Sequence, residues 1–374
     1  MTGKSFLDSN RIWFTIVLLH IAGSILVSLL GLIPFGGIAA ATVIWCLIAD
    51  IPAKNLQRIG ICTVGWIVTV FAMYSLDISF QGTMLLNLIL LLYVFWICKK
   101  AYMNPLEYCY IKKVSVKSIG LIIIAAIFLF IMAGYVNACS MLVFQNLLES
   151  SLQGITDKPL QALIAVAIMP AIIEEVLFRG MIYRGISNKK LAIIISALLF
   201  AFLHMNFNQM CYAFIMGLAF ALVIYMTDNL TVSILLHMLF NAFTVLICCF
   251  PENNIIQAIL RCNIAGYSLF NPILTNRQGN IEMTLMIIGG IIAILSAMIA
   301  AYMIFLIREM QEKKKVEKME IEKNGKTEKV RIAPIEAFQT DTAFSRNKKW
   351  KPNAQFFAGS GICLLVAILY EVLL

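Results

Sequence analysis

Long apolar runs recur along almost the whole chain, and they decide its fold class. Of the 374 residues, 61% are hydrophobic and only 13% are charged, which is not the composition of a soluble domain. A run of about 20 apolar residues can cross a bilayer as a helix, because a helix satisfies its own backbone polar groups. The sequence therefore predicts an all-α fold, a polytopic membrane helix bundle.

About eleven apolar runs qualify as transmembrane spans. The first run lacks a small-residue cleavage site, so we expect no cleavable signal peptide. The ten cysteines form no CxxC pair and are expected to be packing residues rather than disulfides. The predicted spans are Ile12–Pro34, Gly37–Ile51, Ile59–Leu76, Thr83–Cys98, Ile119–Leu142, Leu160–Tyr183, Leu191–His204, Met210–Met226, Leu230–Phe250, Met283–Ile307 and Phe356–Leu374.

Basic residues indicate the orientation of these spans. If all eleven cross, the connections with basic clusters fall on one face, which the positive-inside rule makes cytoplasmic. Segment 308–351 alone holds 13 basic and eight acidic residues, or +5 of the chain's net charge of +9. We expect a multi-pass plasma-membrane protein with its N-terminus and residues 308–355 in the cytoplasm. The charged segment is expected to be a solvated extension or an arm that binds anionic lipid, and no nucleic acid is expected as a partner.

These patterns divide the chain into four parts. Residues 1–117 are predicted to form N-terminal membrane spans. Residues 118–307 are predicted to form a membrane core, whose polar motifs lie between 158 and 250. A charged cytoplasmic segment at 308–355 and a last span at 356–374 complete the chain.

Three charged side chains, Glu174, Glu175 and Arg179, interrupt the apolar run Leu160–Ile182. A charged side chain at the centre of a bilayer costs about 2.5–3.5 kcal/mol on insertion scales. A helix that carries three of them must turn them toward protein or trapped water, which predicts a buried site. The alternative is a structural intramembrane ion pair with a spare acid.

Helix geometry separates the three charges. Glu175 and Arg179 stand four residues apart on one face and can form an ion pair. Glu174 lies about 140° around the helix from Arg179, so it has no local partner. Loss of hydration favours proton uptake by such a carboxylate, which suits a general base. Pro170 removes a backbone hydrogen bond just before the charges and can kink the helix.

Two of the three histidines and one asparagine are predicted to lie at the depth of Glu174. His237 and Asn241 are four residues apart and share a helix face, and His204 ends a neighbouring span. Measured along their spans at about 1.5 Å per residue, all four residues lie in one slab about 10–21 Å from the cytoplasmic ends. We expect the third histidine, His20, to be a packing residue.

A carboxylate, two imidazoles and an amide at one depth suit hydrolysis. The carboxylate and one histidine can take a proton from water, while the other histidine and the amide can donate to an oxyanion. Alternatively, Glu174, His204 and His237 can bind a divalent metal such as zinc, which would activate the water. A transporter or a non-enzymatic scaffold that uses the same polar cluster as a relay is the rival class. Ser233 lies nearby but has no GxSxG elbow.

The polar residues form an ordered set of three motifs. They are Glu174-Glu175-x-x-x-Arg179, Phe200-x-x-x-His204 and His237-x-x-x-Asn241. This set resembles the motifs of the CPBP family, the intramembrane proteases of the CAAX prenyl endopeptidase type, also called the Abi family. The resemblance covers roughly residues 158–250, a quarter of the chain.

The resemblance implies an eight-helix-type membrane core and an endopeptidase for a membrane-associated protein or peptide. Family members are linked to prenylated-protein processing, bacteriocin immunity or protein sorting, and both metal-dependent and metal-free glutamate mechanisms are attributed to them. By position, the resemblance implies a general base assisted by a histidine, an oxyanion-stabilising pair and a supporting ion pair. These are, in that order, Glu174 and His204, His237 and Asn241, and Glu175 and Arg179. Because every motif residue is present, a degenerate member that only binds is disfavoured.

Overall fold

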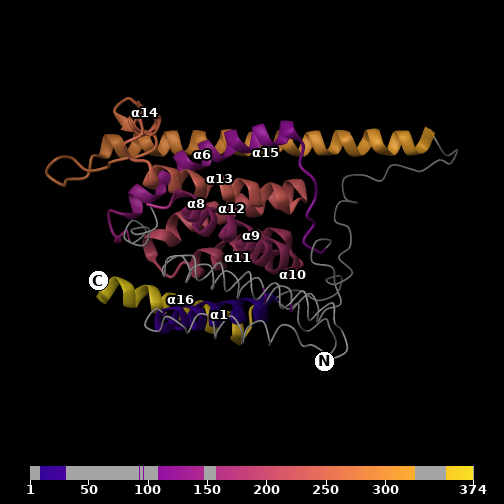
Figure 1. Ribbon diagram of the computed structural model, residues 1–374, viewed down its shortest axis with the longest axis horizontal. Helices are drawn as coiled ribbons and strands as arrows, with labels where there is room; N and C mark the ends of the chain where they lie inside the picture. Colours follow the sequence, from indigo (N-terminus) through magenta and orange to yellow (C-terminus); the bar gives the residue numbers. More distant parts are fainter. Residues whose placement is uncertain are drawn as a thin grey trace.

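The described part of the chain is a bundle of helices (Figure 1). The computed structural model describes residues 9–30, 92, 96, 108–146, 157–324 and 351–373. Within these residues the only sheet is a short antiparallel hairpin, in which Asn263 pairs with Ser268 and Ile264 with Tyr267. The fold is therefore mostly helical, as the sequence predicts.

The named elements, in chain order, are α1 (Ser9–Leu30), α6 (Val116–Ser140), α8 (Pro159–Ala162), η2 (Leu163–Ile168), α9 (Met169–Glu175), η3 (Val176–Ile182), α10 (Tyr183–Gly185), α11 (Lys189–Leu203), α12 (Phe207–Thr227), α13 (Leu230–Cys249), α14 (Asn254–Leu260), β1 (Asn263–Ile264), β2 (Tyr267–Ser268), α15 (Met283–Asn324) and α16 (Ala354–Leu373). The elements η2 and η3 are π-helical segments. Elements α8 to α10 follow one another without a break and form one long irregular helix.

Five helices are long and apolar enough to cross a membrane, which makes the chain an integral membrane protein. The predicted count of about eleven spans is not confirmed. The predicted spans at 37–51, 59–76 and 83–98 lie outside the continuous described segments. The five helices are Val116–Ser140, Pro159–Gly185, Phe207–Thr227, Leu230–Cys249 and Met283–Lys314.

Three further predicted spans lie in described residues but are not among these five helices. Helix α11 has 15 residues, or about 22 Å at 1.5 Å per residue, which is less than the roughly 30 Å of a hydrocarbon core. The predicted span Ile12–Pro34 is described only as far as Leu30, and the last span has a shorter apolar part, Ala354–Leu369. His204 directly follows the last residue of α11, Leu203, and lines a cavity within the bundle.

Asparagine side chains set where three core helices begin. Asn188, Asn206 and Asn229 each accept a backbone N–H from the first turn of α11, α12 and α13, respectively. A helix start leaves such donors unpaired, so these caps stabilise the three helices. Asp228 ends α12 in the left-handed conformation, with φ of 45°, and turns the chain directly into α13.

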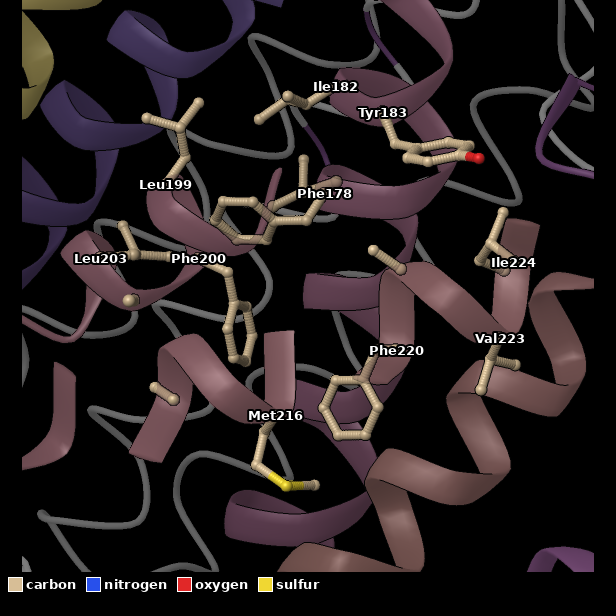
Figure 2. Close-up of a cluster of buried hydrophobic side chains, with 14 of the residues drawn as sticks. Phe178, Ile182, Tyr183, Leu199, Phe200, Leu203, Met216, Phe220, Val223 and Ile224 are labelled. Atoms are coloured by element: carbon tan, nitrogen blue, oxygen red, sulfur yellow. The ribbon is translucent and has the colours of Figure 1, made fainter. Parts of the chain in front are cut away.

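Aromatic side chains fill the core between η3, α11 and α12 (Figure 2). The Phe200 ring lies edge-on to Phe178 and to Phe220, with centroid distances of 5.4 and 6.2 Å. All three rings are buried. The cluster therefore packs an apolar wall beside the helix that carries the charged motif.

Helices α11 and α12 approach each other closely at Gly217. A Cβ atom built on Gly217 would lie 2.9 Å from Cα of Ala197. Real Cβ atoms do not come that close to backbone, so only glycine permits this spacing of the two helices. At this position the Gly217 carbonyl accepts a hydrogen bond from the Arg179 side chain of η3.

The helix that carries the charged motif is not a regular α-helix. The π-helical segments η2 and η3 flank the α-helical segment α9. Pro170, the second residue of α9, has no N–H with which an α-helix would bond the Val166 carbonyl. The backbone irregularity that the sequence predicts at this proline takes the form of a π-helical turn before it, a feature that is frequent at functional sites.

Candidate functional site

A cavity of about 700 Å³ lies among α6, α9, α12 and α13. Glu174, His204, His237 and Asn241 all line it. These four residues come from three parts of the chain, α9, the end of α11 and α13, and the sequence predicts them at one depth in the membrane. The structure places them around one shared space.

Glu174 is the carboxylate that faces this cavity. Its side chain is 21% exposed, and its Oε2 atom lies 3.9 Å from Nε2 of His237. That distance is longer than a direct hydrogen bond. No hydrogen bond joins Glu174 to another described side chain, so its carboxylate is free to accept a hydrogen bond from a water molecule.

Glu175 points away from the cavity into a closed polar network. Its Oε1 atom accepts a hydrogen bond from Nη1 of Arg179 at 2.8 Å, which confirms the predicted ion pair. Its Oε2 atom accepts a hydrogen bond from Oγ of Ser233 at 2.6 Å. Both members of the ion pair are fully buried. Neither Glu175 nor Arg179 lines the cavity, so the structure separates them from the four cavity residues.

The Arg179 guanidinium is held from several sides. Its Nη2 atom donates to the Gly217 carbonyl at 3.0 Å. Its Cζ atom lies 4.5 Å from the centre of the Phe200 ring and 5.3 Å from that of Phe220. Hydrogen bonds and ring faces together compensate a buried cation for lost hydration. Arg179 therefore ties η3 to both α11 and α12.

His237 connects the closed network to the cavity. Its Nδ1 atom lies 3.1 Å from Oε1 of Glu175, while its Nε2 atom faces Glu174. The ring stacks on Phe220 with a centroid distance of 4.6 Å. A carboxylate at one ring nitrogen orients the ring and fixes which nitrogen carries the proton. Glu175 therefore holds Nδ1–H, and Nε2 is left for the cavity.

His204 lies at the turn that follows α11. Its Nδ1 atom is 2.9 Å from the Phe200 carbonyl oxygen, four residues earlier. No hydrogen bond between His204 and Glu174 occurs among the described residues. The two side chains share the cavity without a direct contact, so any assistance from His204 to Glu174 acts through the cavity contents.

Asn241 is held by the irregular helix. Its Nδ2 atom donates to the Val166 carbonyl at 3.1 Å. Val166 is the residue whose carbonyl an N–H at position 170 would bond in a regular α-helix, and Pro170 has none. The proline thus leaves an acceptor that anchors Asn241, and the second amide hydrogen of Asn241 stays available.

The possible ligands in the cavity can be compared with those that a metal ion needs. The sequence allows Glu174, His204 and His237 as ligands for a metal such as zinc. Within the described residues, however, no group of three His, Cys, Asp or Glu side chains is placed to hold one. A structural zinc site needs about four ligands and a catalytic site about three. Among the described residues, the arrangement does not bring three such ligands together and does not fit a metal ion.

The supporting roles of two residues, Ser233 and Gly217, were not predicted from the sequence. Ser233 carries a hydrogen bond to Glu175, and its signal was its spacing, four residues before His237 on the same helix face. Gly217 supplies a carbonyl to Arg179, and no local pattern distinguishes it from other glycines in apolar runs. The spacing of Ser233 is visible in the sequence, whereas the role of Gly217 depends on which helix packs beside η3.

A cavity with a carboxylate, two imidazoles and side-chain amides in its lining lies inside a bundle of helices that are long and apolar enough to cross a membrane, which defines the class as an integral membrane protein. Residues 156–243 match the family model of Rce1-like type II CAAX prenyl endopeptidases. The match confirms the resemblance to the CPBP intramembrane proteases over these residues, and it supports a protease. Comparisons of the chain with curated proteins and with solved structures gave no match.

Proposed function

We propose that this chain is an intramembrane endopeptidase that hydrolyses a peptide bond of a membrane-associated protein or peptide. The observation that carries the proposal is Glu174, a carboxylate without a hydrogen-bonded partner that faces His237 across 3.9 Å in a cavity of about 700 Å³. Such a volume holds several residues of an extended peptide together with water. The family match over residues 156–243 supports the same reaction class.

Glu174 acts as the general base. It accepts a proton from a water molecule, whose oxygen attacks the carbonyl carbon of the scissile bond. The tetrahedral intermediate then collapses, and the proton passes from Glu174 to the departing amine. His204, which lines the same cavity, assists by holding the attacking water or the peptide.

Asn241 and His237 stabilise the oxyanion of that intermediate. One amide hydrogen of Asn241 is used on Val166, which fixes the plane of the amide and leaves the other hydrogen for the oxyanion. To donate from Nε2, His237 must carry a proton on that atom as well as on Nδ1, and Glu175 at Nδ1 orients the ring toward the cavity. Removing one donor from such a site typically lowers kcat by about 10²–10³-fold.

The glutamate mechanism is tested by the variant Glu174→Gln, which keeps the size of the side chain and removes the base. Mass spectrometry of products from purified protein and a panel of peptides is expected to show cleavage lowered by about 10²–10⁴-fold. Glu252→Gln is the matched control, because Glu252 is exposed on a loop outside the cavity. Equal cleavage by Glu174→Gln and wild type would refute the proposal, and charge-dependent solute uptake without peptide products would favour a transporter.

Metal dependence is tested separately. The proposal is a metal-free reaction, supported by a donor set in which three ligands do not converge. Purified protein is dialysed against a chelator, and its metal content is measured by elemental analysis. Full cleavage with less than one metal ion per chain is expected, whereas activity that disappears on dialysis and returns with zinc would contradict it.

The proposed setting of this enzyme is the plasma membrane, with the N-terminus and residues 308–355 in the cytoplasm. The net positive charge of the 308–351 segment supports this orientation and an affinity for anionic lipid. Binding of the purified protein to vesicles with and without anionic lipid, before and after deletion of residues 325–350, would test the lipid contact.

A further inference from the structure

The cavity has a closed inner end and an open outer end. At the inner end the side chains of Glu174 and His237 are 21% and 4% exposed. At the outer end the lining residues Met141 and Ile273 are 50% and 63% exposed. Exposure therefore rises along the cavity toward Met141 and Ile273, which mark its mouth.

The rim of the mouth is preformed. It includes residues 270–275, between the hairpin and α15, which line the cavity. Tyr267, just before this stretch, and Leu274, within it, are buried against a small apolar cluster on α6 and α15. Pro272 packs beside Gly134 of α6, where a built Cβ would lie 3.7 Å away. These contacts hold the rim in place over the cavity.

The mouth lies at one end of the bundle, and the basic connections lie at the other. Figure 1 shows α14, which precedes the rim, at one end, and α10 and the far end of α15 toward the other. At the basic face, six basic and one acidic residue give a net charge of +5; they are Lys112, Lys113, Lys117, Arg184, Lys189, Lys190 and Asp228. At the mouth face, three basic and four acidic residues give a net charge of −1; they are Asp157, Lys158, Glu252, Arg261, Arg277, Glu282 and Glu371.

The wall between the mouth and Glu174 carries side-chain amides and apolar groups. Asn137, Asn146, Gln209 and Asn271 line it. Each amide both donates and accepts, which matches the N–H and C=O groups of a peptide backbone. No lysine or arginine lines the cavity among the described residues, so this wall holds no cation to pair with a carboxylate.

We propose that the cavity takes an uncharged stretch of polypeptide in extended form, entering from the membrane face opposite the basic connections. The proposal rests on the proposed endopeptidase function for what happens to the bound stretch. The entry face itself is independent of catalysis. A charged side chain held against this wall would lose hydration without a counterion, whereas backbone groups find the amides of the wall.

The entry face is tested by thiol labelling in intact cells. Ile273→Cys at the rim and Lys113→Cys at the basic face are made in a Cys262→Ser background, because Cys262 is exposed. That background without a new cysteine is the blank. A charged, membrane-impermeant maleimide is expected to label Ile273→Cys in intact cells and Lys113→Cys only after permeabilisation.

Failure to label Ile273→Cys in intact cells overturns the proposed entry face, as does labelling of Lys113→Cys there. Met141→Cys provides a second rim position if Ile273→Cys does not accumulate. Labelling does not require cleavage. A correct labelling pattern with no peptide cleavage by the wild type would therefore refute the endopeptidase and leave the entry face standing.

The chemistry of the occupant is tested with three peptides of one apolar sequence. One is neutral with an amidated C-terminus, one carries a lysine three residues away from the cleaved bond, and one ends in a free carboxylate three residues beyond it. The lysine is expected to lower kcat/KM at least about tenfold, and the free carboxylate is expected to bring no gain. A tenfold gain from the carboxylate, or no loss from the lysine, overturns the proposed occupant.

Discussion

Two adjacent carboxylates lie in opposite surroundings in this protein. Glu174 faces an open cavity and keeps its hydrogen-bonding capacity free. Glu175 is fully buried and accepts hydrogen bonds from Arg179 and Ser233. The difference shows that one turn of helix can present one carboxylate to the cavity and the next to the buried network that holds the helices together. This is possible because neighbouring residues point about 100° apart.

His237 joins the two regions, and this makes the closed network matter for the reaction. One nitrogen of its ring faces Glu175 and the other faces Glu174. If the hydrogen-bonded network around Glu175 shifts, the His237 ring shifts with it, and His237 is the proposed donor to the oxyanion. The cavity residues should control activity, and the network residues should control stability first and activity through His237.

The largest contrast is expected between Glu174→Gln and Glu175→Gln. The first variant should lose about 10²–10⁴-fold in activity, because the base is gone, with no change in thermal unfolding. The second should lose about 3–5 kcal/mol of stability, because Arg179 is left buried without its countercharge. Cleavage assays and thermal unfolding in detergent measure both. The comparison breaks if Glu174→Gln unfolds earlier than Glu175→Gln.

The next largest effect is expected from Arg179→Met. Glu175 would keep its charge in a buried site, so stability should fall by about 3–5 kcal/mol. The double variant Glu175→Gln with Arg179→Met should recover part of that loss, because no charge is left unpaired. Arg277→Met, at an exposed position, is the matched control. A loss in the double variant equal to the sum of both single losses would contradict the pairing.

A smaller effect is expected from Ser233→Ala. The variant removes a hydrogen bond of 2.6 Å to the Glu175 carboxylate, and hydrogen bonds to charged groups contribute about 1.5–3 kcal/mol. Thermal unfolding measures the loss, and Ser187→Ala, on an exposed turn, serves as control. Unchanged unfolding would show that water replaces the hydroxyl and that the network is less closed than described.

The smallest effect is expected from Gly217→Ala. The added methyl group would meet the backbone of Ala197 at 2.9 Å and push α11 from α12, at a cost of about 1–3 kcal/mol. Gly120→Ala has nothing within 4 Å and should be neutral or stabilising. Equal behaviour of the two variants would mean that the close approach does not position Arg179.

Local patterns predicted more of the site than of the spans. The spacing of Glu175 and Arg179 was enough to predict their ion pair, because residues four apart on a helix are neighbours. The predicted run Leu191–His204 agrees with α11 to within two residues, but a membrane crossing there is not confirmed, because 15 helical residues are shorter than the hydrocarbon core. Predicted roles for the cavity residues stay predictions until the variants are measured.

The sequence by itself determined a helical membrane protein with three charges and two histidines in its core segment, because composition and helical spacing are local properties. Only the tertiary structure decided which carboxylate faces the cavity, that Gly217 approaches Ala197, and that the Val166 carbonyl captures Asn241. Those choices depend on which helices pack together. Packing is decided by contacts between residues far apart in the chain, and such contacts leave no periodic signal in the sequence.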